Sequence, residues 1–269
     1  MKDCKNIVDL NLDILQLIFD QLTRVDQLNL ARTHPIFCDA FAYLYREKLF
    51  KEVYEFQLPT VEDWRYFLPL CGSGVQSLYT YSCTDQMVEL ALQFCPKLEL
   101  ISILSYGFSN IQHNLLQIKT LQEIELINFS SQKNSLIELL HELPKLRILR
   151  LKNCKFDDLF QIKYLTQLEE LEVRLKHDCY KKKPVTEIDS HEMMQDLPDR
   201  QQFEQFLDIC EPLKKLRSLS INLPHIDAKA IQELSLKCPL LINLELWMDV
   251  AIDRSELPII PKLNLTLRK

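Results

Sequence analysis

Residues Leu146–Cys154 read LRILRLKNC, with leucine at the first, fourth and sixth positions. In an extended strand the fourth and sixth side chains point to the same side, so this spacing is typical of a strand with one buried face. A single six-residue stretch with this spacing means little, because leucine and isoleucine are abundant. The same spacing of large aliphatic residues recurs from Leu98, Leu121, Leu168, Leu216 and Leu241, and a degenerate copy begins at Val75.

The copies are spaced like leucine-rich repeats. From Val75 the successive steps are 23, 23, 25, 22, 48 and 25 residues. All but one lie within the period of about 20–29 residues that such repeats have. The long step implies an insertion or an undetected repeat. We place an irregular insertion at about 177–205, where Lys181-Lys182-Lys183 and seven acidic residues are typical of a solvated loop.

Amphipathic stretches separate the copies, at 85–95, 135–143 and 227–238. One strand and one helix per repeat predict an α/β solenoid over residues 75–269, with strands on the concave side and helices on the convex side. The preceding residues 51–74 contain Pro59, Trp64 and Pro69 and are interpreted as a connector with some helix.

Residues that alternate with the inward leucines point to the concave face of such a solenoid. Any one charge there is more simply a solvated residue, whereas aromatic residues are enriched at binding hot spots. We expect a target protein to bind this face. The candidate contacts are Tyr79, Tyr81, Glu123, Glu125, Arg150, Lys152, Glu172, Arg174 and Trp247.

The N-terminal residues predict three short helices. LDILQLIFDQL, residues 12–22, has apolar residues at helical spacing, and Asn11 suits its N-cap. A second helix is expected near Asp26 and must end at Pro35, and a third runs from Phe37 to about Phe50. Ile14, Leu17 and Ile18 exceed what a small three-helix core needs. They pack either on a partner or on the next domain.

The N-terminal helices share an ordered set of residues at fixed spacing, namely Leu10-Asn11, Asp13, Ile14-Leu15, Ile18-Phe19, Leu22, Asp26, Leu28, Leu30 and Phe37. On these residues the segment 7–50 resembles an F-box. Two positions depart from the family: Asn11 stands where the family has proline, and Thr33-His34 stands where Val-Cys is common.

The resemblance implies that this module docks onto the Skp-type adaptor of a cullin-based SCF ubiquitin ligase, and through it joins the cullin and RING subunits. The chain would then be a substrate receptor, with a repeat scaffold that acts without ubiquitylation as the alternative. Apolar residues of the first two helices would fill a groove on the adaptor. The candidates are Leu10, Leu12, Ile14, Leu15, Ile18, Phe19, Leu28 and Leu30.

The repeats also resemble the cysteine-containing subtype common in F-box proteins. Cys95-Pro96 and Cys238-Pro239 each close a helical stretch, and Cys154 follows Leu151 at that subtype's buried turn position. We therefore interpret these cysteines as small core residues rather than as ligands or nucleophiles.

Several functions are disfavoured by composition. Three glycines in 269 residues argue against nucleotide-binding loops, and a net charge of -6 argues against nucleic acid. The six histidines show no metal-ligand spacing. Nine cysteines without a CxxC pair, and no signal-like or membrane-spanning stretch, favour reduced thiols in the cytoplasm and/or nucleus. We expect a protein that is not an enzyme and that uses no cofactor or metal.

Overall fold

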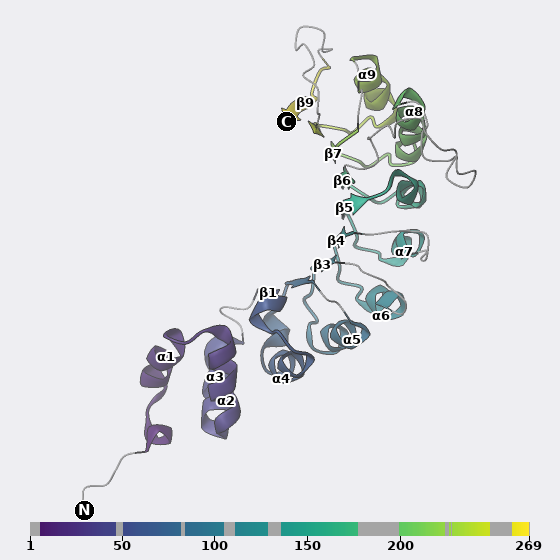
Figure 1. The fold of residues 1–269 in the computed structure, drawn as a ribbon. Coiled ribbons are helices and arrows are strands. Elements are labelled where there is room, and N and C mark those ends of the chain that lie inside the picture. The colour runs from purple at the N-terminus through teal and green to yellow at the C-terminus, as the bar shows by residue number, and fades with distance from the viewer. Residues whose placement is uncertain are drawn as a thin grey trace, which may run out of the picture. The chain divides into compact units, whose positions relative to one another are not determined.

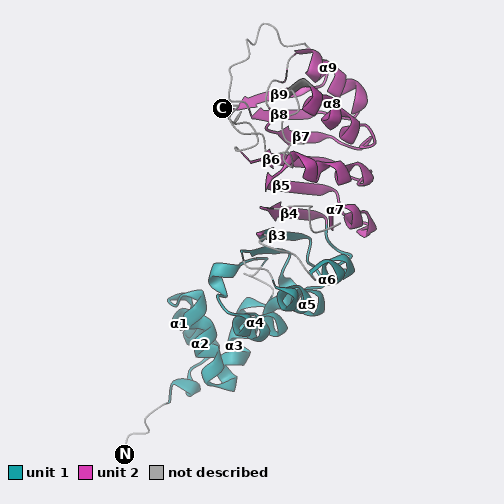
Figure 2. Cartoon of the chain, turned by 45° about the vertical axis from the view of Figure 1, so that its right-hand side comes forward, with its two compact units in different colours: residues 1–103, 110–121 teal, residues 104–109, 122–269 magenta. Residues whose placement is uncertain are grey.

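The computed structural model describes residues 6–46, 51–81, 84–104, 111–128, 136–176, 199–223, 226, 228–247 and 260–268. The chain forms two compact units (Figure 2). Unit 1 comprises residues 1–103 and 110–121, and unit 2 comprises residues 104–109 and 122–269.

Unit 1 begins with a short 3-10 helix, Ile7–Asp9, and three helices, α1 (Leu12–Asp20), α2 (Arg24–Thr33) and α3 (Pro35–Tyr45). The Asn11 side chain accepts a hydrogen bond from the Ile14 amide at 3.0 Å, which confirms the predicted N-cap. The second helix starts slightly earlier than expected, at Arg24, because the Thr23 side chain caps it by accepting a hydrogen bond from the Asp26 amide. Pro35 occupies the first turn of α3, where its missing amide is no loss.

An aromatic core holds these three helices together. Phe19 of α1 is fully buried, and its ring centroid lies 5.8 Å from that of Phe41 and 6.0 Å from that of Tyr45, both on α3. Leu15 and Leu28 are buried beside them. The side of α1 that carries Leu15 and Phe19 is therefore the inner face of the bundle.

Residues 51–74, predicted as a connector, contain regular structure. They form β1 (Glu52–Tyr54), a 3-10 turn (Glu55–Gln57), α4 (Val61–Cys71) and a second 3-10 turn (Gly72–Gly74). Strand β1 pairs in parallel with β2 (Ser77–Thr80). Helix α4 buries Trp64 and Phe67. This segment thus supplies a strand and a helix like those of the repeats that follow.

The carboxylate of Asp63 joins α4 to the N-terminal helices. Its Oδ1 lies 2.8 Å from Arg32 Nη2, and its Oδ2 accepts the Thr60 hydroxyl at 2.6 Å. Burial by itself would raise the pKa of Asp63, but the hydrogen bonds from Thr60 and Arg32 outweigh burial and hold the pKa below its ordinary value of 3.8. A folded carboxyl with a lowered pKa stabilises fully above the unfolded pKa, and this contribution is lost as the pH falls through the folded value.

We therefore expect Asp63→Asn to lower the free energy of unfolding at pH 7 by about 1–2 kcal/mol, because a buried charged hydrogen-bond network is broken. The variant should also lose less stability than the parent as the pH falls below 3.8. Urea unfolding at pH 7 and pH 3 measures both effects, with the exposed Asp39→Asn as control. Equal pH dependence in parent and Asp63→Asn would contradict this assignment.

The rest of unit 1 continues the alternation of strand and helix with α5 (Asp85–Phe94), β3 (Leu100–Leu104, of which Leu104 is counted in unit 2) and α6 (Ile111–Gln117). Strands β2 and β3 are parallel, with Leu78 opposite Ile101. A side chain at Gly72 would place its Cβ 2.7 Å from the carbonyl oxygen of Phe94, so glycine is required where these two segments meet.

Unit 2 repeats the same plan (Figure 1). Strand β4 (Glu123–Ile127) precedes α7 (Leu136–Leu139), which runs into a 3-10 turn (Leu140–Glu142). Strand β5 (Ile148–Cys154) precedes the 3-10 segment η6 (Phe156–Tyr164), and β6 (Glu170–Leu175) precedes α8 (Asp199–Cys210). Strand β7 (Ser218–Ile221), α9 (Ala228–Lys237), β8 (Asn243–Trp247) and β9 (Asn264–Arg268) complete it.

The strands stand in chain order, β1 to β9, in a parallel sheet, which confirms the predicted α/β repeat architecture. The repeat leucines lie in register across it, so that Leu149 has Ile124 on one side and Leu171 on the other. The row continues through Leu219 and Leu244. These side chains are buried, and stacking them gives the sheet a continuous core.

The long step in the repeat is an insertion. Strand β6 pairs directly with β7, so no further strand lies between them. Residues 199–205 of the predicted insertion belong to α8, and 177–198 lie outside the described residues.

The cysteines of the repeats are core residues, as expected. Cys95, Cys154 and Cys238 are buried cysteines in the reduced state. Burial raises the pKa of Cys95 to about 12, which keeps the thiol protonated at neutral pH. The turn that ends in Cys154 needs a left-handed residue at Asn153, with φ of 56°, and Asn128 has the same φ one repeat earlier. Asparagine tolerates this conformation better than most residues do.

Candidate functional site

The first candidate surface is an apolar ledge on α1, formed by Ile14, Leu17 and Ile18. These residues are spaced three and four positions apart and so share one face of the helix. The side chains of Ile14 and Leu17 are 41% and 61% exposed, and Ile18 is half-buried. The bundle is thus closed without these side chains, and they remain open to contact from outside α1.

The eight predicted adaptor contacts separate into two groups. Leu15, Phe19 and Leu28 are buried in the bundle and are core residues instead, because their side chains have no surface left for a partner. Ile14 is exposed, and four more are half-buried, namely Leu10, Leu12, Ile18 and Leu30. Leu17 is the most exposed residue of the ledge but was absent from the predicted contacts. The signal was available in the sequence, because Leu17 lies three residues after Ile14 and was already among the apolar residues that exceed the needs of the helical core.

A cavity of about 440 Å³ opens at the end of α1 and the start of α2. Its wall includes Asp20, Arg24, Tyr45 and Phe56. The Tyr45 hydroxyl donates to Asp20 Oδ1 at 3.0 Å, and burial together with this bond raises the pKa of Tyr45. Burial lowers the pKa of Arg24. The cavity therefore has one charge of each sign and favours no single charge class of ligand.

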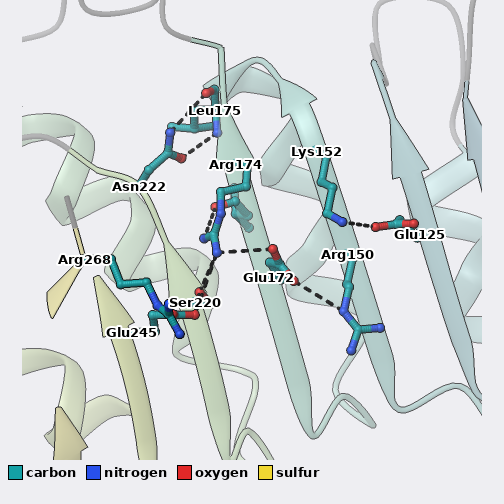
Figure 3. Close-up of polar contacts among 11 residues, drawn as sticks. Glu125, Arg150, Lys152, Glu172, Arg174, Leu175, Ser220, Asn222, Glu245 and Arg268 are labelled. Carbon is teal, nitrogen blue, oxygen red and sulfur yellow. Dashed lines mark hydrogen bonds and ion pairs between the residues drawn. The ribbon is translucent and has the colours of Figure 1, made fainter. Parts of the chain in front are cut away.

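The second surface is the strand face of unit 2, where charged side chains form what we call the charge ladder (Figure 3). Arg150 pairs with Glu123 on one neighbouring strand and, at 3.3 Å, with Glu172 on the other. Lys152 pairs with Glu125. The ladder comprises Glu123, Glu125, Arg150, Lys152, Glu172, Arg174, Glu245 and Arg268.

The C-terminal end of the ladder surrounds Trp247. The guanidinium carbon of Arg174 lies 4.3 Å from the indole centroid, and that of Arg268 lies 5.5 Å from it. Glu245 accepts a hydrogen bond from Ser220 at 2.6 Å and pairs with both arginines. Burial alone would raise the pKa of Glu245, but the Ser220 bond and Arg268 outweigh burial and lower it. Trp247 thus already has cations over its ring.

The ladder is neutral as a whole, since four carboxylates meet four cations. The structure brings together the predicted residues Glu123, Glu125, Arg150, Lys152, Glu172, Arg174 and Trp247 on this face. Sequence reasoning missed Arg268, because β9 has Lys262 where the other repeats have their first aliphatic residue. A partner of this face must displace internal ion pairs or match them.

The two remaining predicted contacts, Tyr79 and Tyr81, belong to unit 1. There they form an aromatic–acidic cluster with Glu52, Tyr54, Glu55 and Phe56. The rings of Tyr54 and Tyr79 stack at 4.5 Å with an interplanar angle of 8°, and Phe56 lies 5.5 Å from Tyr54. Tyr54, Phe56 and the two glutamates were missed, because β1 carries only a partial repeat hexamer.

The described part of the chain contains no group of three or more His, Cys, Asp or Glu side chains arranged to hold a metal ion. Within the same residues, no helix is long and apolar enough to cross a membrane.

Comparison with known proteins does not assign this chain to a family. No protein-family model matches it, and no curated protein matches it. Among solved structures, a TLR13–ssRNA13 complex is similar over 74% of this chain and 33% of that one, with 14% identity and a TM-score of 0.41. The Rad7–Elc1 complex from yeast is similar over 94% of this chain and 92% of that one, with 12% identity and a TM-score of 0.28. Likenesses this low carry no functional argument.

Proposed function

We propose that this chain is a substrate receptor of an SCF-type ubiquitin ligase. The observation that carries the proposal is the apolar ledge of Ile14, Leu17 and Ile18, which stays outside a helical bundle that is already closed. In this function the N-terminal helices bind the Skp-type adaptor and the repeats hold a target protein. The chain itself performs no chemistry, and it acts by positioning the target for another subunit's active site.

Two lines of support meet on this ledge. Burying apolar surface is worth about 25 cal/mol per Å², so side chains as exposed as Ile14 and Leu17 gain from a covering partner. The resemblance of residues 7–50 to an F-box then indicates that this partner is a Skp-type adaptor, since the first helix of that family docks on the adaptor. Ile14 and Ile18 are members of both the ledge and the F-box pattern.

The test is co-purification of the full chain with a Skp-type adaptor. We expect Ile14→Asp with Leu17→Asp to weaken adaptor binding at least about tenfold, because each charge would have to be buried without a partner. Leu236→Asp is the matched control: this leucine is 79% exposed on α9 of unit 2. Circular dichroism checks that both variants remain folded.

Unchanged adaptor binding by the folded ledge variant would contradict the proposal, as would failure of the parent chain to bind any Skp-type adaptor. Adaptor binding without recruitment of a cullin would instead favour a repeat scaffold that acts without ubiquitylation.

A further inference from the structure

We infer that the aromatic–acidic cluster of unit 1 binds a lysine or arginine side chain of the target protein. This inference rests on the proposed function only in taking the repeat region to hold a protein target. It goes further by naming the contact and the chemistry of what fills it.

The geometry of the cluster follows from the parallel register. Tyr54 of β1 stands opposite Tyr79 of β2, and Glu52 stands opposite Ser77. Residues two apart in a strand share a face, so Glu52 and Tyr54 lie on the same side of the sheet as Tyr79. Val53, between them, is buried on the other side. The strand register and the pleat of the sheet thus place the rings of Tyr54 and Tyr79 and the Glu52 carboxylate on the same face of the sheet.

The cluster leaves a large aromatic surface in water. Phe56 is 67% exposed and Tyr81 is 51% exposed, although both are bulky. Tyr54 and Tyr79 cover each other by stacking, while Phe56 extends the row at a tilt of 30°. Exposed aromatic side chains next to one another are typical of binding surfaces rather than of ordinary solvated strands.

The electrostatics of the cluster favour a cation. The faces of aromatic rings carry negative potential, and cations bind over them. Glu52 accepts the Tyr54 hydroxyl at 3.0 Å, and Glu55 accepts the backbone amide of Tyr81. The pKa of Tyr54 is raised, mainly because its hydroxyl donates to Glu52. Hydrogen bonds therefore hold the Glu52 carboxylate at the hydroxyl edge of the Tyr54 ring and the Glu55 carboxylate at the backbone of Tyr81.

In the charge ladder of unit 2, an aromatic ring and a carboxylate already have cations bound to them. There an aromatic ring, Trp247, has two guanidinium groups over it. In unit 1, among the described residues, no cation lies over Tyr54, Phe56 or Tyr81, and Glu52 has no ion pair. Within the described part of the chain, the Tyr54 ring and the Glu52 carboxylate thus lack the cation that the ladder supplies for Trp247 and Glu245. A target side chain can supply it.

An organic cation fits this cluster better than a metal ion does. Metal ions such as calcium and magnesium require several oxygen ligands around one point, whereas two carboxylates and a row of rings supply charge and a flat apolar surface. Lysine and arginine bring both a charge and an apolar stem to such a surface. Phe56 also lines the cavity of about 440 Å³, which offers room for a neighbouring side chain of the target.

The experiment uses the full chain as bait for a random-peptide phage library. We expect the enriched sequences to share a lysine or arginine. In a synthetic copy of the best peptide, replacing that residue by norleucine should weaken binding at least about tenfold, because the charge is lost while the stem remains. Fluorescence anisotropy measures the affinity.

Variants of the chain locate the contact. Phe56→Ala with Tyr81→Ala, and separately Glu52→Gln with Glu55→Gln, should each weaken peptide binding about tenfold. The matched controls are Tyr43→Ala on α3 and Glu138→Gln on α7, both exposed, and they should bind like the parent. Circular dichroism confirms the fold of each variant.

Enrichment of peptides without a cation, no enrichment at all, or binding that survives both double variants would overturn the inference. Adaptor binding is measured on the same variants through the separate apolar ledge. If the adaptor binds and the cluster variants have no effect on the peptide, this inference alone fails. If the adaptor never binds but the peptide results hold, the ligase assignment alone fails.

Discussion

Phe19→Ala is expected to lower the free energy of unfolding by about 3–5 kcal/mol, whereas Leu17→Ala is expected to change it by less than about 0.5 kcal/mol. The two residues are two positions apart on α1, and both are large and apolar. Phe19 is fully buried against the rings of Phe41 and Tyr45, so its loss leaves a cavity in the small bundle. Leu17 already has most of its side chain in water.

Urea unfolding followed by circular dichroism measures both effects, and adaptor binding adds a second readout. Leu17→Ala should weaken adaptor binding although the chain stays as stable as the parent. Phe19→Ala should weaken binding only to the extent that the helices unfold. A large loss of stability in Leu17→Ala would mean that the apolar ledge is covered within the chain, and the proposed docking surface would be withdrawn.

Leu149→Ala is expected to lower the free energy of unfolding by about 2–5 kcal/mol, and Arg150→Ala by less than about 1 kcal/mol. These neighbours on β5 point to opposite faces of the sheet. Leu149 is fully buried, with Ile124 and Leu171 beside it in register. Arg150 has 28% of its side chain in solvent and forms ion pairs that water and salt screen.

Thermal and urea unfolding in low and high salt separate the two cases. The effect of Leu149→Ala should be nearly independent of salt, because it arises from packing. The smaller effect of Arg150→Ala should decrease further as salt rises. If Arg150→Ala proved the more destabilising variant, the charge ladder would be a main structural element of unit 2, and binding of a target there would require breaking it.

The two strand faces differ in what they offer a target. In unit 2 the cations and carboxylates satisfy one another, so this face resists simple charge-based binding. In unit 1 the rings of Phe56 and Tyr81 and the Glu52 carboxylate are exposed to solvent. The predicted target contacts therefore differ in availability, and Tyr81 is the most exposed of them.

The sequence predicted seven strands from one recurring six-residue pattern of aliphatic residues, because the pattern has a direct physical cause. Residues such as Leu149 and Leu151 must lie on one face of a strand and stack on the next repeat, so their spacing and their period are both visible in the chain. Strands β1 and β9 were missed for the same reason. Within the sheet formed by the described residues, each pairs with only one other strand and tolerates a polar residue in the repeat pattern, as at Glu55 and Lys262.

The predicted sites depended on information that spacing does not contain. Leu15 and Ile14 are adjacent and equally apolar, yet one is core and the other is surface. Helical periodicity gives two apolar stripes on α1 without saying which one faces α3. Likewise the alternation of Glu172 and Arg174 shows that they share a face, but not that Arg174 bonds to Ser220 and Glu245 on later strands.

By itself the sequence determined the repeat, its period, the inward leucines and the three N-terminal helices, because each follows from contacts between residues close in the chain or from a regular repeat. Only the tertiary structure decided which side of α1 is closed, which charges neutralise each other, and which rings remain in water. Those properties depend on how segments distant in sequence pack together, since burial and ion pairing are set by the neighbours that packing brings within a few ångströms.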